Sequence, residues 1–248
     1  WSAIFTRMVA DIHAAADKDR QADKIVTGGW CHSLYFTPLV LEAGFVCRMT
    51  GDAIAAAHVA RQIDKLARVY GDPPSSFHRE ISNLSPQSKL SAYFSNAHTS
   101  LAACMCRDGL PPESWKQLAD LARTRLIDDH ADPYFLTHYN AAHNAVVTHL
   151  IAGAICALTF GRESGYPDTE RIVELGRDAC AMHVQWGFDE QGVPFEGPMY
   201  SHVTLEWVFL MAELLRRHGG EDLFRTLPRL SAIAQATLEM QLPGLQGF

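Results

Sequence analysis

Apolar residues recur along almost the whole chain at the three- and four-residue spacing of a helix face. Three clear sets are Leu39, Val40, Ala43, Val46 and Cys47; Val146, Leu150, Ala154, Cys156 and Leu158; and Leu205, Phe209, Ala212 and Leu215. A convincing alternation of apolar and polar residues, which is the mark of a half-buried strand, does not occur. The pattern therefore predicts an all-α fold in which strands are at most minor.

Glycines mark a weak internal repeat. Apolar helices are expected to end at Gly51, Gly109, Gly161 and Gly219, which lie 58, 52 and 58 residues apart. Glycine just past a helix end is the usual left-handed cap, and each interval has room for a second, antiparallel helix. These second helices are predicted at 53–69, 112–126, 168–185 and 220–242. Stacked hairpins of this kind form an open solenoid or a toroid, and the repeat alone does not choose between them.

The two ends of the chain look like cuts through a longer protein. The sequence begins with Trp1, inside a helical pattern, and ends on residues 243–248, which read as a linker or the start of a strand. We interpret residues 1–242 as one domain of a longer protein. Loops are predicted at 71–83 and 187–200, where glycine and proline gather.

Composition narrows the class of protein. Of 248 residues, 48% are hydrophobic, which is enough for a sizeable core. The formal net charge is -7 and no run of like charges occurs, so a basic stripe for nucleic acid is not expected. No apolar run looks long enough to span a bilayer, so we expect no membrane partner.

Cysteine and histidine do not form metal-binding motifs. The six cysteines lie mostly in apolar helical segments and are interpreted as free, buried, small hydrophobic residues. The twelve histidines include no HExxH motif and no compact ligand set. A glycine-rich phosphate loop is also missing from the sequence. We therefore expect neither a metal nor another cofactor.

The first of two polar clusters lies at the entrance of the apolar helix 203–215. Its polar and turn residues are Glu196, Gly197, Pro198, Tyr200 and His202. Glycine allows a close approach of the backbone, and proline fixes the entry into a helix. A carboxylate, a phenol and an imidazole thus gather within a few positions of one helix start, which favours a site.

The second cluster lies upstream, in residues 138–149. Asn140, His143 and Asn144 have the spacing of one helix face. Buried polar side chains need partners, so this stripe is either a structural network between helices or the polar wall of a cleft. His138 and His149 are more typical of cap or surface histidines.

Both clusters resemble motifs of the heparinase II/III-like polysaccharide lyases, including related alginate lyases. Residues 189–200 resemble the family phrase of Asp-Gly, an aromatic residue, Glu-Gly, a short gap and Tyr, followed by an apolar helix. Residues 138–144 resemble the Asn- and His-bearing helix start of that family, and residues 45–52 resemble its early helix and turn. The resemblance touches most of the chain and is specific in the first two motifs.

The resemblance implies an incomplete (α/α) toroid of antiparallel helical hairpins, followed by β-sheet domains, in a periplasmic or secreted protein. It also implies β-elimination at a uronic acid of an acidic polysaccharide or oligosaccharide. A lyase of this kind neutralises the substrate carboxylate, removes the hydrogen on the adjacent ring carbon and protonates the leaving oxygen.

Roles follow from the resemblance residue by residue. Tyr200 would be the acid and is also a candidate base, and His143 is the second candidate base. Asn140 or Asn144 would bind the substrate carboxylate. The other implied substrate-binding residues are Glu196, His202 and His138. A tyrosine has a pKa near 10, so a nearby cation or hydrogen-bond donor must favour the phenolate if it acts as base.

Two other functions remain open at this point. A glycoside hydrolase would need two carboxylates across a cleft, for which Glu196 with Asp189 or Glu206 are candidates. A non-catalytic helical scaffold or glycan-binding module would use both clusters structurally. The arginines that could bind an acidic substrate are Arg48, Arg79, Arg107, Arg125, Arg162 and Arg177.

Overall fold

The computed structural model describes residues 2–21, 39–70, 86–127 and 143–241. Nearly all of these residues are helical, and within them the only extended pairing is an isolated antiparallel bridge between Phe188 and Pro194. The all-α prediction is confirmed for this part of the chain. The predicted loop 71–83 and the expected linker 243–248 lie outside the described residues.

Long helices alternate with short turns. The long helices are α1 (Ser2–Gln21), α2 (Val40–Thr50), α3 (Ala53–Tyr70), α5 (Pro86–Met105), α6 (Pro112–Leu121), α9 (Asn144–Cys156), α11 (Thr169–Trp186), α12 (Pro198–His218) and α14 (Arg229–Gln241). The short elements are η1 (Arg107–Gly109), α10 (Arg162–Ser164), α13 (Leu223–Thr226) and two π-helical turns, η2 (Ala122–Leu126) and η3 (Ala157–Gly161).

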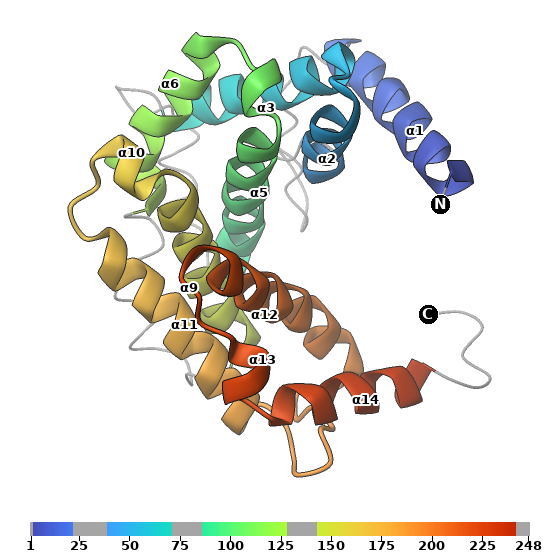
Figure 1. Ribbon diagram of the computed structural model, residues 1–248, viewed down its shortest axis with the longest axis vertical. Helices are drawn as coiled ribbons and strands as arrows, with labels where there is room; N and C mark the ends of the chain where they lie inside the picture. Colours follow the sequence, from blue (N-terminus) through green and yellow to red (C-terminus); the bar gives the residue numbers. More distant parts are fainter. Residues whose placement is uncertain (1, 22–38, 71–85, 128–142, 242–248) are drawn as a thin grey trace.

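The long helices form two rows along an arc. Helices α2, α5, α9 and α12 pack one against the next and make the inner row. Helices α3, α6 and α11 pack on the outside of that row. The arc runs from α1 at one end to α14 at the other, and these two end helices lie apart (Figure 1). Of the helix pairs that the repeat predicts, α2 packs with α3 and α9 packs with α11.

Small residues let neighbouring helices approach closely. A Cβ atom on Gly44 of α2 would come within 2.5 Å of the Cα of Ala102 on α5. Gly176 of α11 is pressed against Ala154 of α9 in the same way. Large side chains such as Ile151 and Met211 fill the core between these contacts. Close packing of this kind means that substitutions at either glycine would push two helices apart.

The predicted left-handed glycine cap is confirmed at Gly51, lies one residue later than predicted at the end of α12, and is not formed at Gly161. Gly51 adopts the left-handed conformation, with φ 71°, and donates its N–H to Cys47 O at 2.8 Å. Helix α12 ends before Gly219, and Gly220 is the left-handed residue. Gly161, however, has φ -54° and stays inside the helix, which continues to Ser164. Thr169 packs against the Cα of Gly161, so the Cβ atom of any larger residue at this position would clash with it.

Gly109 also differs from the prediction, since α5 ends at Met105 and Gly109 closes the short turn η1. The helices predicted at 53–69, 112–126 and 168–185 are confirmed within one or two residues, the second of them through η2. The helix predicted at 220–242 is wrong as a single element. Pro228 separates α13 from α14, because proline cannot continue a helix from the preceding turn.

The interpretation of the cysteines is wrong for one pair. Cys47 of α2 and Cys106 after α5 form a disulfide, with their Cα atoms 5.4 Å apart. Cys104, Cys156 and Cys180 are free thiols. Burial raises the pKa of Cys156 to about 12, so this thiol stays protonated and inert near neutral pH. Spacing in the sequence could not reveal the pair, because stacking of the inner helices brings it together.

The expectation about membrane spans also needs correction. Residues Val146–Ser164 form one continuous helix that is long and apolar enough to cross a membrane by length and composition. Of that window, 78% is buried inside the fold. Its surroundings are α5, α11 and α12, so the apolar surface is covered by protein, as in a core helix.

Candidate functional site

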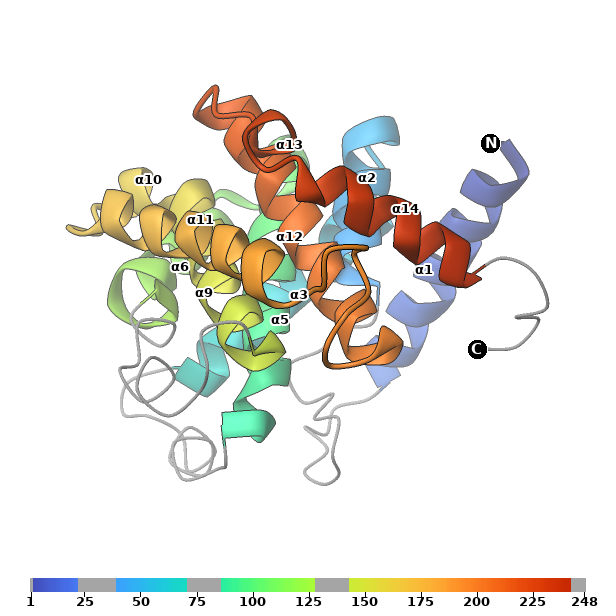
Figure 2. The same cartoon turned by 90° about the horizontal axis from the view of Figure 1, so that it is seen from below.

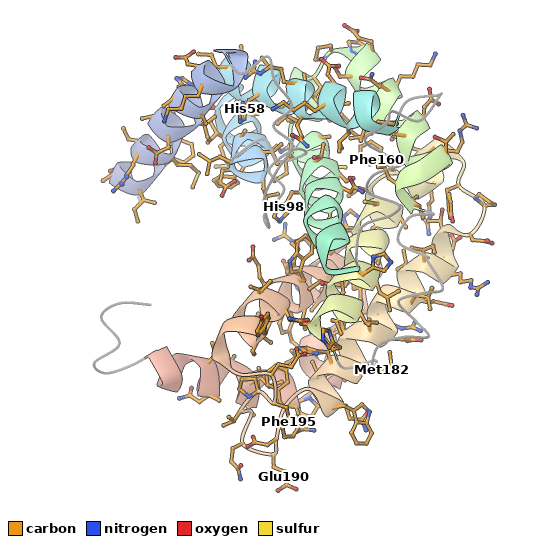
Figure 3. The ribbon with its side chains drawn as sticks, turned by 180° about the vertical axis from the view of Figure 1, so that it is seen from behind. His58, His98, Phe160, Met182, Glu190 and Phe195 are labelled. Carbon is orange, nitrogen blue, oxygen red and sulfur yellow. A yellow bond between two sulfur atoms is a disulfide. The ribbon has the colours of Figure 1, made fainter. Side chains whose placement is uncertain are left out.

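The loop that carries the first polar cluster is a compact turn between α11 and α12. The carboxylate of Asp189 accepts hydrogen bonds from the backbone N–H of Gln191 at 2.9 Å and of Val193 at 2.8 Å. The backbone N–H of Phe195 donates to Gly187 O at 3.0 Å and closes the base of the loop. Aspartate is suited to this because its short side chain reaches backbone groups two residues ahead. Glu190 lies at the tip, pointing away from the helices (Figure 3).

The loop ends at two residues that suit the start of a helix. Gly197 has φ 85° and ψ 164°, a conformation that side chains disfavour, and Pro198 opens α12. The carbonyl of Gly197 accepts a hydrogen bond from the N–H of Ser201 at 3.2 Å. The predicted loop therefore ends at Gly197. Tyr200 lies in the first turn of α12, and 54% of its surface is exposed.

Glu196 joins the two polar clusters. Its Oε2 accepts a hydrogen bond from the backbone N–H of Asn144 at 3.1 Å. Its Oε1 lies 3.7 Å from Nε2 of His143, which is ion-pair distance. A carboxylate at the start of a helix is stabilised by the unpaired N–H groups and by the helix dipole. Glu196 thus caps α9 from a loop 52 residues further along the chain.

His143 does not lie within the helix, as its spacing predicts, but just before it. Its backbone carbonyl accepts hydrogen bonds from the N–H groups of Val146 at 3.0 Å and Val147 at 3.2 Å, which is the position of an N-cap residue. Asn144 is the first residue of α9 and is half-buried. The capping carboxylate comes from a distant loop, so the local sequence could not place this boundary.

The structure brings together three of the predicted site residues: His143, Asn144 and Glu196. Tyr200 lies four residues beyond Glu196, on the helix that this loop opens. His202 follows in the same helix, with its side chain outside the described part of the structure. The predictions for His138 and Asn140 also fall outside the described residues.

The interpretation of His149 as a cap or surface residue is wrong. It is fully buried on α9, among the helices that surround this element. A second histidine, His98 on α5, is labelled in Figure 3. Its ring stacks on Trp207 of α12, with ring centroids 5.0 Å apart and planes 13° apart. Burial lowers the pKa of His98 to about 4. His149 is thus fully buried, whereas His98 is partly exposed.

Most of the candidate arginines are held by nearby carboxylates. Arg107 pairs with Glu163 at 3.0 Å and lies over the ring of Trp115. Weaker or exposed pairs join Arg48 to Asp108, Arg162 to Glu170 and Arg177 to Asp178. The side chains of Arg79 and Arg125 are not among those described.

A cation that the sequence did not single out is Arg229, which binds the backbone of the loop before α12.

Within the described residues, no three His, Cys, Asp or Glu side chains are grouped to hold a metal ion. A comparison of the chain with protein-family models and with curated proteins finds no match.

Proposed function

We propose that this protein is a polysaccharide lyase that cleaves uronate-containing glycans by β-elimination, on an incomplete (α/α) toroid. The observation that carries the proposal is the bridge from Glu196 to the start of α9. It joins the loop of the tyrosine motif to the histidine motif, and both motifs resemble those of heparinase II/III-like lyases. The arc of paired helices is compatible with such a toroid.

In this proposal, Tyr200 protonates the leaving glycosidic oxygen and is also a candidate for removing the ring hydrogen. Its exposed position in the first turn of α12 leaves it accessible to a polymer. His143 is the alternative base. The carboxylate of Glu196 would orient its imidazole, in the way that a carboxylate orients the histidine of a general-base pair.

The substrate carboxylate would be bound by Asn144 or Asn140, as the motif implies. The predicted role of Glu196 in substrate binding stays a prediction beside its contacts to the protein. The partner is an acidic polysaccharide or oligosaccharide. The disulfide between Cys47 and Cys106 favours an oxidising compartment, which fits a periplasmic or secreted lyase. The resemblance of the two motifs also implies a following β-sheet domain.

The test is an assay of the full chain on a panel of uronate polymers, which detects the unsaturated product by its ultraviolet absorbance. Tyr200→Phe removes only the phenolic O–H and should lower kcat at least about 100-fold, the usual effect of losing a general acid. Val203→Ala, which trims an exposed residue one turn further along α12, is the matched control and should stay active. Full activity of Tyr200→Phe overturns the assignment. Release of saturated reducing ends instead would identify a hydrolase.

A further inference from the structure

Arg229, the first residue of α14, binds three backbone carbonyls around the end of α11. Its Nη1 donates to Gln185 O at 2.7 Å. Its Nη2 donates to Phe188 O at 2.9 Å and to Asp189 O. The three carbonyls belong to the last turn of α11 and to the first residues of the loop that leads to Glu196. One side chain from the far end of the chain therefore holds the root of this loop.

The chemistry of this contact is specific to arginine. Carbonyls at a helix C-terminus carry partial negative charge, which attracts a cation. The planar guanidinium presents several N–H groups in fixed directions, so it reaches three acceptors at once. A lysine ammonium keeps the charge but is a compact point donor without the planar fork.

A second contact fixes the same loop on α14. Gly192 has φ 85° and lies so close to α14 that a Cβ atom there would come within 2.9 Å of Ala232 O. Figures 1 and 2 show the loop beside α14 in both views. The loop is thus held at its root by Arg229 and near its tip by close backbone packing.

The loop is stiff enough to transmit this anchoring to Glu196. The Asp189 carboxylate ties the turn internally, and the Phe188–Pro194 bridge joins its two arms. The N–H of Phe195, the residue before Glu196, is bonded to Gly187 O. These bonds form a continuous path from the guanidinium on α14 to the carboxylate that caps α9.

We infer that Arg229 is a positioning residue, which holds Glu196 against His143 and the start of α9 by fixing the loop between them. The catalytic meaning of this role rests on the proposed function, but the positioning does not. Removing the guanidinium should release the root of the loop and loosen the Glu196 contact, while the helices of the opposite end stay packed.

The backbone amide of Asn144 reports the contact directly, because its N–H is bonded to Glu196. We expect Arg229→Met to speed hydrogen exchange at Asn144 about tenfold or more, as local opening becomes easier. The amide of Gly51, bonded to Cys47 O at the other end of the arc, should keep its rate. Arg229→Lys should lie between wild type and Arg229→Met. Arg225→Met, which removes an exposed charge from α13, should change neither amide.

Unchanged exchange at Asn144 in folded Arg229→Met overturns the inference, whatever the activity of the protein. Equal acceleration at Asn144 and Gly51 also overturns it, because that result means general destabilisation. If Arg229→Met fails to fold, the same comparison is made with Arg229→Lys. If wild type cleaves uronate polymers, the Asn144 effect should accompany a fall in kcat with little change in KM. A wild type that cleaves none weakens the proposed lyase and leaves the exchange result intact.

Discussion

Glu196 accepts a hydrogen bond from the backbone N–H of Asn144 at 3.1 Å, although the two residues lie 52 positions apart. The loop before α12 therefore supplies a carboxylate that caps the start of α9. A local cap would stabilise one helix only. This long-range cap also fixes the distance between the two motifs, so a change at Glu196 should affect both the stability of the fold and the arrangement of the site.

Replacing Glu196 should measure the strength of this cap. Glu196→Ala removes the acceptor for the Asn144 N–H and the charge near the helix start. We expect a loss of about 1 kcal/mol in the free energy of unfolding, the usual cost of losing an N-cap acceptor. Glu190→Ala removes the same charge from the exposed tip of the same loop and should cost less than about 0.5 kcal/mol. Urea unfolding of both variants gives the comparison, and equal losses would argue against capping by Glu196.

The disulfide between Cys47 and Cys106 should be a major source of stability. It links residues separated by 59 positions, and closing a loop of this length restricts the unfolded chain by about 4 kcal/mol in the chain-entropy account. The double variant Cys47→Ala with Cys106→Ala should lose stability on this scale. Cys104→Ala, a neighbouring free thiol, is the control. Peptide mapping of unreduced protein should recover the linked pair, and alkylation of both thiols without reduction would contradict it.

Local structure could be predicted from the sequence where local residues determine it. Apolar periodicity placed the helices, and Gly51 and Pro198 marked true helix boundaries because each satisfies a backbone requirement of its own turn. Gly161 misled the prediction, since its small size serves packing against Thr169 rather than a turn. Glycine can either end a helix or allow close packing inside one, and the sequence alone does not distinguish these two roles.

The site was predictable as a list of residues but not as a geometry. The motifs nominated Glu196, His143 and Asn144, which the structure brings together. The pairing of Cys47 with Cys106 and the anchoring by Arg229 depend on which helices become neighbours. Tertiary contacts of this kind leave no mark in local spacing. Among the described residues, Arg229 binds backbone carbonyls, and the identity of the residues that supply them does not reveal such a contact.

The stability of the fold in acid should depend on Asp52, which lies between α1 and the start of α3. Its carboxylate accepts hydrogen bonds from the N–H of Ala55 at 2.8 Å and contacts His13 Nε2 at 2.9 Å. Burial opposes ionisation, but the hydrogen bonds from Ala55 and His13 outweigh it and lower the pKa of Asp52. A lowered carboxyl pKa stabilises the fold above the unfolded value of about 3.9, and this stability is lost as pH falls through the folded value.

Asp52→Asn keeps an acceptor for the helix start and removes the charge, so the variant should lack this acid-dependent loss. The difference in unfolding free energy between pH 6 and pH 3 should therefore be smaller in Asp52→Asn than in wild type. Asp64→Asn removes an exposed carboxylate from α3, the helix whose start Asp52 caps, and is the matched control. An unchanged pH profile in Asp52→Asn would show that the carboxylate does not stabilise the helix start.

His98 should make the inner row of helices sensitive to mild acid. Burial beside Trp207 lowers the pKa of His98 from about 6.5 to about 4, so the folded protein holds the ring neutral while the unfolded chain protonates it. Stability should therefore rise with pH between about 4 and 6.5, by at most about 3 kcal/mol from this residue. His98→Phe keeps an aromatic ring against Trp207 and removes the titration, and should flatten this part of the profile. His218→Gln, on the exposed end of α12, should leave it unchanged. Unfolding at pH 4.5 and pH 7 measures the difference, and an NMR titration of His98 near its ordinary pKa would contradict the explanation.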